Sequence, residues 1–189
     1  MIPILRSTPS AIPSIEQHLL ALEPPDRFLR FCSNASDDSI HTYVASLNLS
    51  DDDVGFHCIN DRLDVVGFVH IAVRGGTAEL GISVSNSERG RGIGGALFDR
   101  AVAFCVATGI TVMYMNCLAA NAAMQHIARS RSIKTITEYG VSEGAVDLSD
   151  RNALLALADS WAHDGLGLYD LNWKLVHQLL TIATTLKSS

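Results

Sequence analysis

A cluster of glycines between a strand-like run and a helix-like run constrains the fold of this chain more than any other feature. The segment "ERGRGIGGALFDR", residues 88–100, has four glycines at positions 90, 92, 94 and 95. It follows "TAELGISV", which is typical of a strand. It opens "GGALFDRAVAFCVATG", whose apolar spacing predicts a helix that ends at Gly109. Glycines at such a junction let backbone N–H groups converge on an anion at the start of a helix.

The glycines fit two phosphate-binding signatures at once. Gly90, Gly92 and Gly95 have the G-x-G-x-x-G spacing of dinucleotide-binding folds. Arg89, Gly92 and Gly94 form R-x-x-G-x-G instead. The two readings predict different ligands and different positions of the turn in the fold.

The surrounding sequence decides between the two signatures. A dinucleotide-binding fold places its glycines after the first strand and an acid about 20 residues later. Here three strand-like runs come first, and residues 100–137 hold no Asp or Glu. A Walker P-loop also fails, because no Lys-Ser or Lys-Thr follows the glycines. The remaining interpretation is a pyrophosphate turn between a strand and a helix.

The rest of the chain divides into helical and strand-like segments. "IPIL" is a candidate first strand, and "IEQHLLALE", "DRFLRFC" and "SDDSIHTYVASLN" predict early helices, the last with Ser36 as N-cap. "VGFHCIN", "LDVVGFVHIAV" and "TAELGISV" predict an antiparallel meander. After the glycine turn and its helix, "ITVMYMNCL" predicts a buried strand, "NAAMQHIARS" a helix, and "KTITEYG" with "VSEGAVDL" a final strand pair.

Length and charge limit the possible partners. The chain has 189 residues, 48% of them hydrophobic, which suits one core and an extension. Its net charge of −6 argues against binding nucleic acid. Residues 89–137 nevertheless carry a net +5, so the remainder carries −11. A cationic stretch beside a glycine turn suggests a small polyphosphate ligand, and scattered solvated arginines are the plain alternative.

Cysteine use and the N-terminus bear on where the protein works. Cys32, Cys58, Cys105 and Cys117 show no C-x-x-C spacing, which predicts reduced, packed thiols and neither disulfides nor a metal site. The segment "MIPILRSTPS" lacks the pattern of a signal peptide, and no apolar run approaches membrane-spanning length. We therefore expect a cytoplasmic protein that does not enter a membrane.

The segment "VSNSERGRGIG", from Val84 to Gly94, resembles the main motif of the GNAT family of N-acetyltransferases. The resemblance spans most of residues 1–148, and "MNCLAANAAMQHIA" is similar to a second family motif, with Asn121 at the start of its helix. "PPDRFLRF" and "SDDSIHTYV" look like the early helices of a bacterial subgroup that includes protein-lysine acetyltransferase domains and small stand-alone proteins. The implied fold class is α/β (α+β): a mixed, mostly antiparallel sheet with splayed central parallel strands and helices on both faces.

The resemblance also implies a co-substrate, acetyl-CoA, and the residues that hold it. Its pyrophosphate would meet the N–H groups of residues 89–94, in a gap where strands 77–84 and 110–117 splay apart, and its pantetheine arm would pair with the first of these strands. Arg129 or Arg131 would be a further phosphate ligand unless both are solvated surface. The implied cofactor-binding residues are Ile82, Val84, Arg89, Gly90, Arg91, Gly92, Gly94, Gly95 and Asn121.

Acetyl transfer to an amine needs a base, because a lysine amine with a pKa near 10.4 is protonated at neutral pH. Glu79 in "AELGISV" resembles the glutamate of the protein-acetyltransferase subgroup, so we expect it to be the base; a solvated residue at a strand start is the alternative. His70 is the second candidate. Many family members place a tyrosine acid where this chain has Ala128, so the proton donor stays open, with Tyr114 and Tyr139 as substitutes.

The acceptor side and the C-terminal segment are less constrained. By analogy, residues 27–31 and a hairpin near 139–145 would wall the acceptor, so Phe28, Arg30 and Phe31 are candidates for substrate contact. Packing of helices is the other role for the two phenylalanines. Residues 149–189 predict a C-terminal helical extension with two apolar stripes, beyond a GNAT domain at 1–148. We expect it to pack on the domain or to form a homodimer.

The sequence thus predicts an enzyme, an acetyl-CoA-dependent N-acetyltransferase that moves an acetyl group to a primary amine by direct attack in a ternary complex. The acceptor is a small-molecule amine or a protein lysine. Two other functions stay open: a catalytically weak acyl-CoA-binding sensor of the same fold, and an unrelated nucleotide-binding protein.

Overall fold

The computed structural model describes residues 3–50, 52–116, 121–131, 135–137 and 143–149. Tyr139, Cys117 and all of the predicted C-terminal extension except Ser149 lie outside these residues. The described elements follow the predicted order: β1 (Ile4–Arg6), a 3₁₀ turn η1 (Pro9–Ala11), α1 (Ile12–Leu20), α2 (Pro24–Phe31), α3 (Asp37–Ser46), β2 (Asp53–Ile59), β3 (Val65–Arg74), β4 (Thr77–Val84), η2 (Asn86–Glu88), α4 (Ile93–Ala107), β5 (Val112–Asn116), α5 (Ala122–Ser130), β6 (Thr135–Thr137) and β7 (Glu143–Asp147).

The strands form one mixed sheet in the order β1-β2-β3-β4-β5-β7-β6. Strands β1 to β4 pair antiparallel, as the three period-two runs predicted, and β7 pairs antiparallel with both β5 and β6. Among the described strands, only β4 and β5 are parallel, because the connection between them crosses over through α4. The predicted α/β class and the mostly antiparallel sheet are confirmed.

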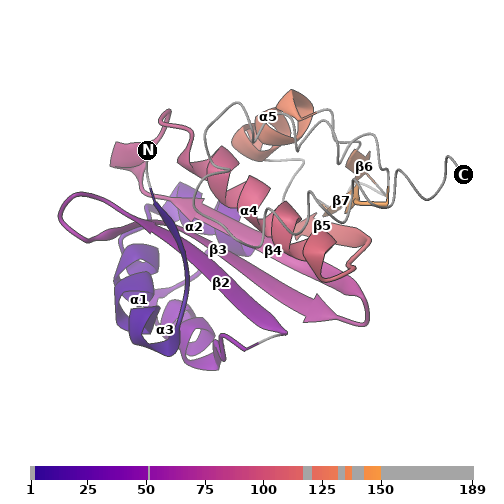
Figure 1. Ribbon diagram of the computed structural model, residues 1–189. Coiled ribbons are helices and arrows are strands. Elements are labelled where there is room, and N and C mark those ends of the chain that lie inside the picture. The colour runs from indigo at the N-terminus through magenta and orange to yellow at the C-terminus, as the bar shows by residue number, and fades with distance from the viewer. Residues whose placement is uncertain (1–2, 51, 117–120, 132–134, 138–142, 150–189) are drawn as a thin grey trace, which may run out of the picture.

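Helix α4 covers one face of the sheet and builds the larger core (Figure 1). Its apolar residues meet alternate residues of the central strands, because successive strand side chains point to opposite faces. Gly109, with φ 78°, follows the helix and ends it as predicted. The buried side chains that meet in this core include Leu97, Phe98, Ala101, Val102 and Cys105 of α4 and Val69, Ile71, Ala78, Leu80, Met113 and Met115 of the strands.

Helices α1 and α3 cover the opposite face and form a smaller core with Phe68 of β3. The fully buried members from the helices are Ile15, Leu19 and Ile40. Ser36 is the N-cap of α3, as predicted, and its hydroxyl oxygen accepts a hydrogen bond from the Ser39 N–H at 3.2 Å. Each face of the sheet therefore has its own apolar support.

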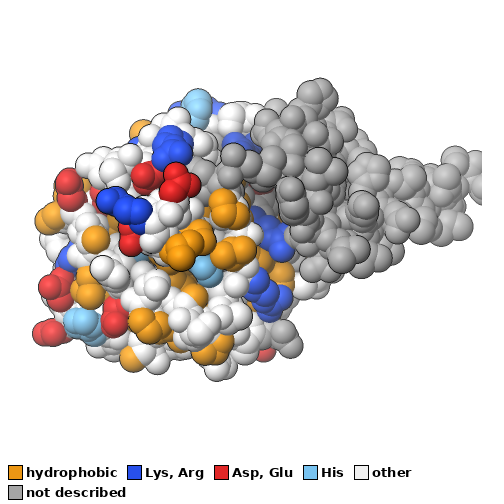
Figure 2. Space-filling view, turned by 60° about the vertical axis from the view of Figure 1, so that its left-hand side comes forward, with side chains coloured by type: hydrophobic (Ala, Val, Ile, Leu, Met, Phe, Trp, Pro, Cys, Tyr) orange, Lys and Arg blue, Asp and Glu red, His pale blue; other side chains and the backbone are white. Residues whose placement is uncertain are grey.

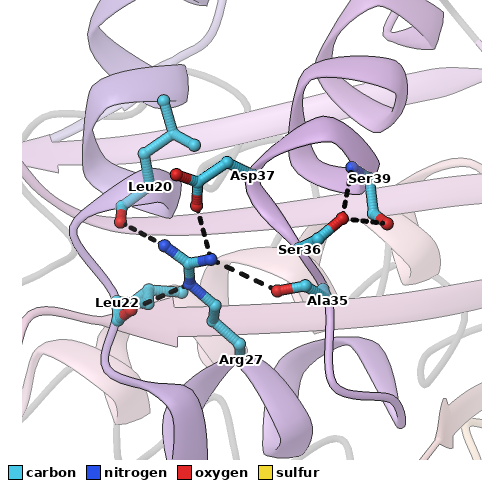
Figure 3. Close-up of polar contacts among 7 residues, drawn as sticks. All are labelled: Leu20, Leu22, Arg27, Ala35, Ser36, Asp37 and Ser39. Carbon is cyan, nitrogen blue, oxygen red and sulfur yellow. Dashed lines mark hydrogen bonds and ion pairs between the residues drawn. The ribbon is translucent and has the colours of Figure 1, made fainter.

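Arg27 of α2 ties the end of α1 to the start of α3 (Figure 3). Its guanidinium donates to the carbonyl oxygens of Leu20 at 2.6 Å, Leu22 at 2.9 Å and Ala35 at 3.2 Å. It also pairs with the Asp37 carboxylate at 2.7 Å. The Leu20 carbonyl lies at the end of α1, where a helix leaves carbonyl oxygens without an intrahelical partner. Arg27 therefore satisfies acceptors at the end of α1 and in the segment before α3.

We expect Arg27→Met to lower the free energy of unfolding by about 2–4 kcal/mol, because three partly buried carbonyls lose their donor. Asp37→Asn is the matched control. The Asp37 side chain is 68% exposed, so its pair with Arg27 should contribute less than about 1 kcal/mol. Urea unfolding of both variants would check this. Equal losses would show that the ion pair, and not the carbonyl contacts, joins the helices.

The cysteines correct one expectation. Cys58 and Cys105 are free thiols in the large core, and burial raises the pKa of each to about 12. Cys32, at the end of α2, is disulfide-bonded, so the prediction of reduced thiols throughout is wrong. Disulfides depend on the approach of two Cα atoms in space, which cysteine spacing in the sequence does not reveal.

In the part of the chain that the structure describes, no helix has both the length and the apolar character needed to cross a membrane.

Candidate active site

The two parallel strands separate partway along β4. Pairing of β4 with β5 runs from Thr77 opposite Val112 to Leu80 opposite Met115 and goes no further within the described residues. Strand β3 stays paired with β4 as far as Val84. From Gly81 onward, the edge of β4 that faces β5 therefore has no described strand partner. The described pairing thus ends next to the glycine turn, where the sequence predicts that the strands splay apart, and residues 117–120 after β5 lie outside the described part of the chain.

The glycine turn ends at the first turn of α4. Gly90 and Gly92 have φ of 72° and 80°, in the region that only glycine adopts freely, and Gly92 is the N-cap of α4. A Cβ added at either position would meet no described atom within 4 Å. The first N–H groups of an α-helix lack intrahelical acceptors, and the helix dipole adds positive potential there. The arrangement can hold an anion such as a pyrophosphate.

The other two glycines of the motif have a packing role. A Cβ at Gly94 would lie 3.5 Å from Ile127 and 3.7 Å from Val84, in ordinary contact. A Cβ at Gly95 would lie 2.7 Å from Nη2 of Arg131, which is too close. A side chain at Gly95 would therefore press on the Arg131 guanidinium, which pairs with Asp99.

The arginines of the cationic stretch have different partners. Arg89 pairs with Asp26 of α2, and Arg91 pairs with Glu88 of η2. Their side chains are 49% and 58% exposed, so both guanidinium groups remain accessible at the turn. Figure 2 shows the same mixing on one face of the molecule, where acidic and basic side chains lie beside one another. The net charge of +5 on residues 89–137 is thus partly neutralised by nearby acidic side chains.

Arg131 is a structural residue. Its guanidinium forms a two-pronged ion pair with the buried Asp99 of α4, with Nη2 at 2.6 Å from Oδ2, and lies over the Phe98 ring. This pair joins the end of α5 to α4. The charge of Arg131, which the sequence suggested as a phosphate ligand, is therefore already balanced by Asp99. Arg129 is exposed and contacts Gln125 at 3.4 Å.

Asn121 begins α5 as the sequence predicted. Its Oδ1 accepts a hydrogen bond from the Met124 N–H at 3.1 Å, which makes it the N-cap. Ala128, at the position of the usual family tyrosine, is buried on the same helix. The described part of α5 therefore offers no hydroxyl at that position.

Glu79 lies on the sheet face that α1 and α3 partly cover. It is exposed, it shares this face with Gly81 and Ser83 of β4, and its partner across β5 is the exposed Tyr114. Burial raises the pKa of the Tyr43 hydroxyl, and the negative charge of Glu79 acts in the same direction. The predicted base is thus solvent-accessible at the start of the splay.

His70, the second candidate for the base, is part of a chain of hydrogen bonds. Arg30 donates to the Tyr43 hydroxyl at 2.6 Å, Tyr43 contacts Nδ1 of His70 at 2.9 Å, and Nε2 of His70 bonds to Asp53. An arginine can only donate hydrogen bonds, and a carboxylate can only accept them. When the His70 ring is neutral, the Tyr43 hydroxyl therefore donates to Nδ1 of His70, and Nε2 of His70 donates to Asp53. Burial lowers the pKa of His70, against the pull of Asp53. Both ring nitrogens are engaged, which leaves no lone pair for an incoming amine.

His18 of α1 is a buried polar residue that the sequence did not single out. Its Nε2 and Nδ1 lie 2.9 Å and 3.1 Å from the hydroxyls of Ser83 and Ser85 at the end of β4. Burial, and to a lesser degree the charge of Arg30, lowers its pKa to about 4. A histidine inside an apolar helical run carries no sequence signal, as is also true of Tyr43 and Asp53.

Lowering the pH should destabilise the fold through His18. The folded pKa of about 4 lies below the unfolded value of 6.5, so the unfolded chain binds the proton first. This contribution is complete above pH 6.5 and falls as the pH drops toward 4, by at most about 3 kcal/mol. Urea unfolding across this pH range should show that the free energy of unfolding falls less steeply for His18→Gln than for the unmodified protein.

His41→Gln is the control of opposite sign. The hydrogen bond to Glu16 raises the pKa of the exposed His41, so removing it should make the acid loss steeper. If the free energy of unfolding of His18→Gln fell as steeply with decreasing pH as that of the unmodified protein, the assignment to His18 would be contradicted.

Comparisons with known proteins agree with this geometry. The sequence matches the Acetyltransferase (GNAT) family over residues 16–131, more than half of the chain. The chain therefore belongs to the GNAT family, a family of acetyltransferase enzymes. No curated protein sequence matched it.

Solved structures share the fold at low sequence identity. The GNAT domain of S. lividans PAT has a TM-score of 0.63 at 16% identity, with 77% of this chain and 88% of that one covered. The phosphinothricin acetyltransferase of Sinorhizobium meliloti in complex with AcCoA has 0.57 at 15%, covering 77% and 86%. The PaiA N-acetyltransferase of Thermoplasma acidophilum in complex with coenzyme A has 0.57 at 14%, covering 77% and 97%.

Proposed function

We propose that this protein transfers the acetyl group of acetyl-CoA to a primary amine by direct attack in a ternary complex. The observation that carries the proposal is the position of the glycine turn at the N-terminus of α4, beside the point where β4 and β5 separate. An anion site and an open strand edge side by side suit a ligand with a pyrophosphate at one end and an amide-containing arm. Acetyl-CoA has this chemistry and would supply the thioester.

The proposed cofactor site has two parts. Residues 89–94 hold the pyrophosphate, with Gly90 and Gly92 shaping the turn and Arg89 and Arg91 beside it. The open edge of β4, at Ile82 and Val84, offers backbone groups to the pantetheine arm. Gly94 and Gly95 keep the first turn of α4 close to α5, and Asn121 begins α5. The fit rests on open backbone groups and accessible arginines, and no metal is needed for it.

We expect Gly92→Val to abolish acetyl-CoA binding, because a branched side chain at φ 80° distorts the turn and crowds the helix N-terminus. Gly109→Val is the matched control. Gly109 has φ 78° and equal room for a Cβ, but it lies at the other end of α4. Its variant should share the backbone strain and keep the affinity. Calorimetry would separate the two, and unchanged affinity in Gly92→Val would refute the assignment.

Glu79 is the proposed general base. A protonated amine must give up a proton before it can attack the thioester carbonyl, and the Glu79 carboxylate would accept that proton, directly or through a water. The C–N bond then forms, the C–S bond breaks, and coenzyme A leaves as the thiolate, which takes up a proton. The exposure of Glu79 and its place on the face with Tyr114 support this role. The engagement of both ring nitrogens of His70 makes that residue the weaker candidate. Tyr114, the exposed strand partner of Glu79, is the candidate among the described tyrosines to donate a proton to the thiolate.

Glu79→Gln should lower turnover by about 10²–10⁴, the usual effect of losing a general base, with little change in acetyl-CoA affinity. Raising the pH should partly restore turnover, since more amine is then neutral. Asp61→Asn, in the β2–β3 turn, is a control that removes an exposed acid elsewhere. Turnover of Glu79→Gln within a few fold of the unmodified enzyme at every pH would exclude Glu79 as the base.

One observation favours a second function. The buried Ala128 stands at the family tyrosine position, so a weakly catalytic acyl-CoA sensor of the same fold is the alternative. Acetyl-CoA binding without turnover on a panel of amines would support it.

Several features of the proposed enzyme rest on the sequence alone. The acceptor is a small amine or a protein lysine, as the resemblance of the early helices to the protein-lysine acetyltransferase subgroup suggests. We further propose a cytoplasmic protein in which the C-terminal segment packs on the domain or joins a homodimer.

A further inference from the structure

Arg30 of α2 differs from the other arginines near the site. Arg27, Arg89 and Arg131 each form an ion pair with a carboxylate. Among the described residues, no carboxylate lies within ion-pair distance of Arg30, and its Nε is buried without a hydrogen-bond acceptor. A partly buried cation without a counterion is costly unless a ligand supplies the negative charge.

The guanidinium of Arg30 is held firmly. It lies over the rings of Phe31 at 4.8 Å and Tyr43 at 5.2 Å, within the range of cation–π contacts. Its Nη2 donates to the Tyr43 hydroxyl, and the chain through His70 to Asp53 fixes that hydroxyl in turn. This support orients the guanidinium and leaves Nη1 without a partner among the described residues.

Gly81 makes room for this guanidinium at the splay. A Cβ at Gly81 would overlap the guanidinium, with Nη2 only 2.8 Å away. The φ of Gly81 is not positive, so the glycine acts here through space and not through conformation, and a larger residue would have to displace the Arg30 guanidinium. Gly81 is also the first residue of β4 beyond its pairing with β5. The charge therefore lies where the strand edge opens.

We propose that Arg30 binds a carboxylate of the acceptor, so that the acceptor is an amino acid. Glu79 and Gly81 lie on the same face of β4, two residues and therefore about 7 Å apart. The Glu79 carboxylate and the Arg30 guanidinium, which lies over Gly81, would suit a molecule that carries an amine and a carboxylate a few ångströms apart. The amine would meet Glu79 and the carboxylate Arg30. This inference rests on the proposed acetyltransferase function and specifies its substrate class.

The test compares amino acids with their amides as acceptors for the full-length protein and acetyl-CoA. Each pair, such as phenylalanine with phenylalaninamide and lysine with lysinamide, differs only in the negative charge. We expect kcat/KM to favour the acid by about 10–100-fold, the effect of a charge-assisted hydrogen bond. In Arg30→Met the ratio should fall to near one, mainly through loss of the acid. Arg62→Met, an arginine with an 85% exposed side chain, should keep the ratio.

A second variant tests the proposal independently, in case Arg30→Met does not fold. Tyr43→Phe keeps the ring but removes the hydroxyl that orients the guanidinium, so it should lower the preference for the acid several-fold. Circular dichroism would confirm that both variants are folded.

The outcomes separate the two proposals. Turnover with equal rates on acids and amides would overturn the amino-acid assignment and leave the acetyltransferase function standing. No turnover on any amine would count against the acetyltransferase function, and calorimetry with phenylalanine and its amide would then decide on Arg30. Acid-selective binding that is lost in Arg30→Met would support the carboxylate site, whereas no such binding would overturn it.

Discussion

The parallel pairing of β4 with β5 ends at Leu80, and the positions of the candidate site residues depend on that end. Before it, the two strands share a hydrogen-bonded ladder and a common core with α4. Beyond it, β3 is the only strand partner of β4 among the described residues, so the edge of β4 that faces β5 has no described strand against it. A fully paired β4 would place the same glycines at a closed sheet, where a long ligand could not reach both the helix N-terminus and the strand.

The same strand separates two kinds of environment. One face of β4 contributes Ala78 and Leu80 to the apolar core under α4. The other face presents Glu79, Gly81 and Ser83 in turn, with exposure at the first, a guanidinium over the second and His18 bonded to the third. Strand alternation thus places the proposed base, the proposed carboxylate site and a structural histidine on one line. The buried polar groups on this face are largely satisfied, so it can be rigid without being apolar.

The arginines show how partners determine the role of identical side chains. Arg131 is consumed by a buried carboxylate and holds two helices together, and Arg27 is consumed by helix-end carbonyls. Arg89 and Arg91 keep accessible guanidinium groups although each pairs with a carboxylate, Asp26 of α2 and Glu88 of η2. Arg30 alone of these lacks an acid within the described residues. A positive charge counted in the sequence is therefore not a measure of the charge available to a ligand.

The sequence by itself determined the order of the elements, the meander, the cap at Ser36, the helix end at Gly109 and the glycine turn. These depend on local periodicity and on φ values that glycine tolerates, so neighbouring residues suffice to predict them. The tertiary structure decided what distant residues do for one another: the pair between Asp99 and Arg131, the engagement of His70 and the placement of Arg30 over Gly81. Each joins segments far apart in the chain, and only the packing of helices on the sheet brings such groups within hydrogen-bonding or bonding distance.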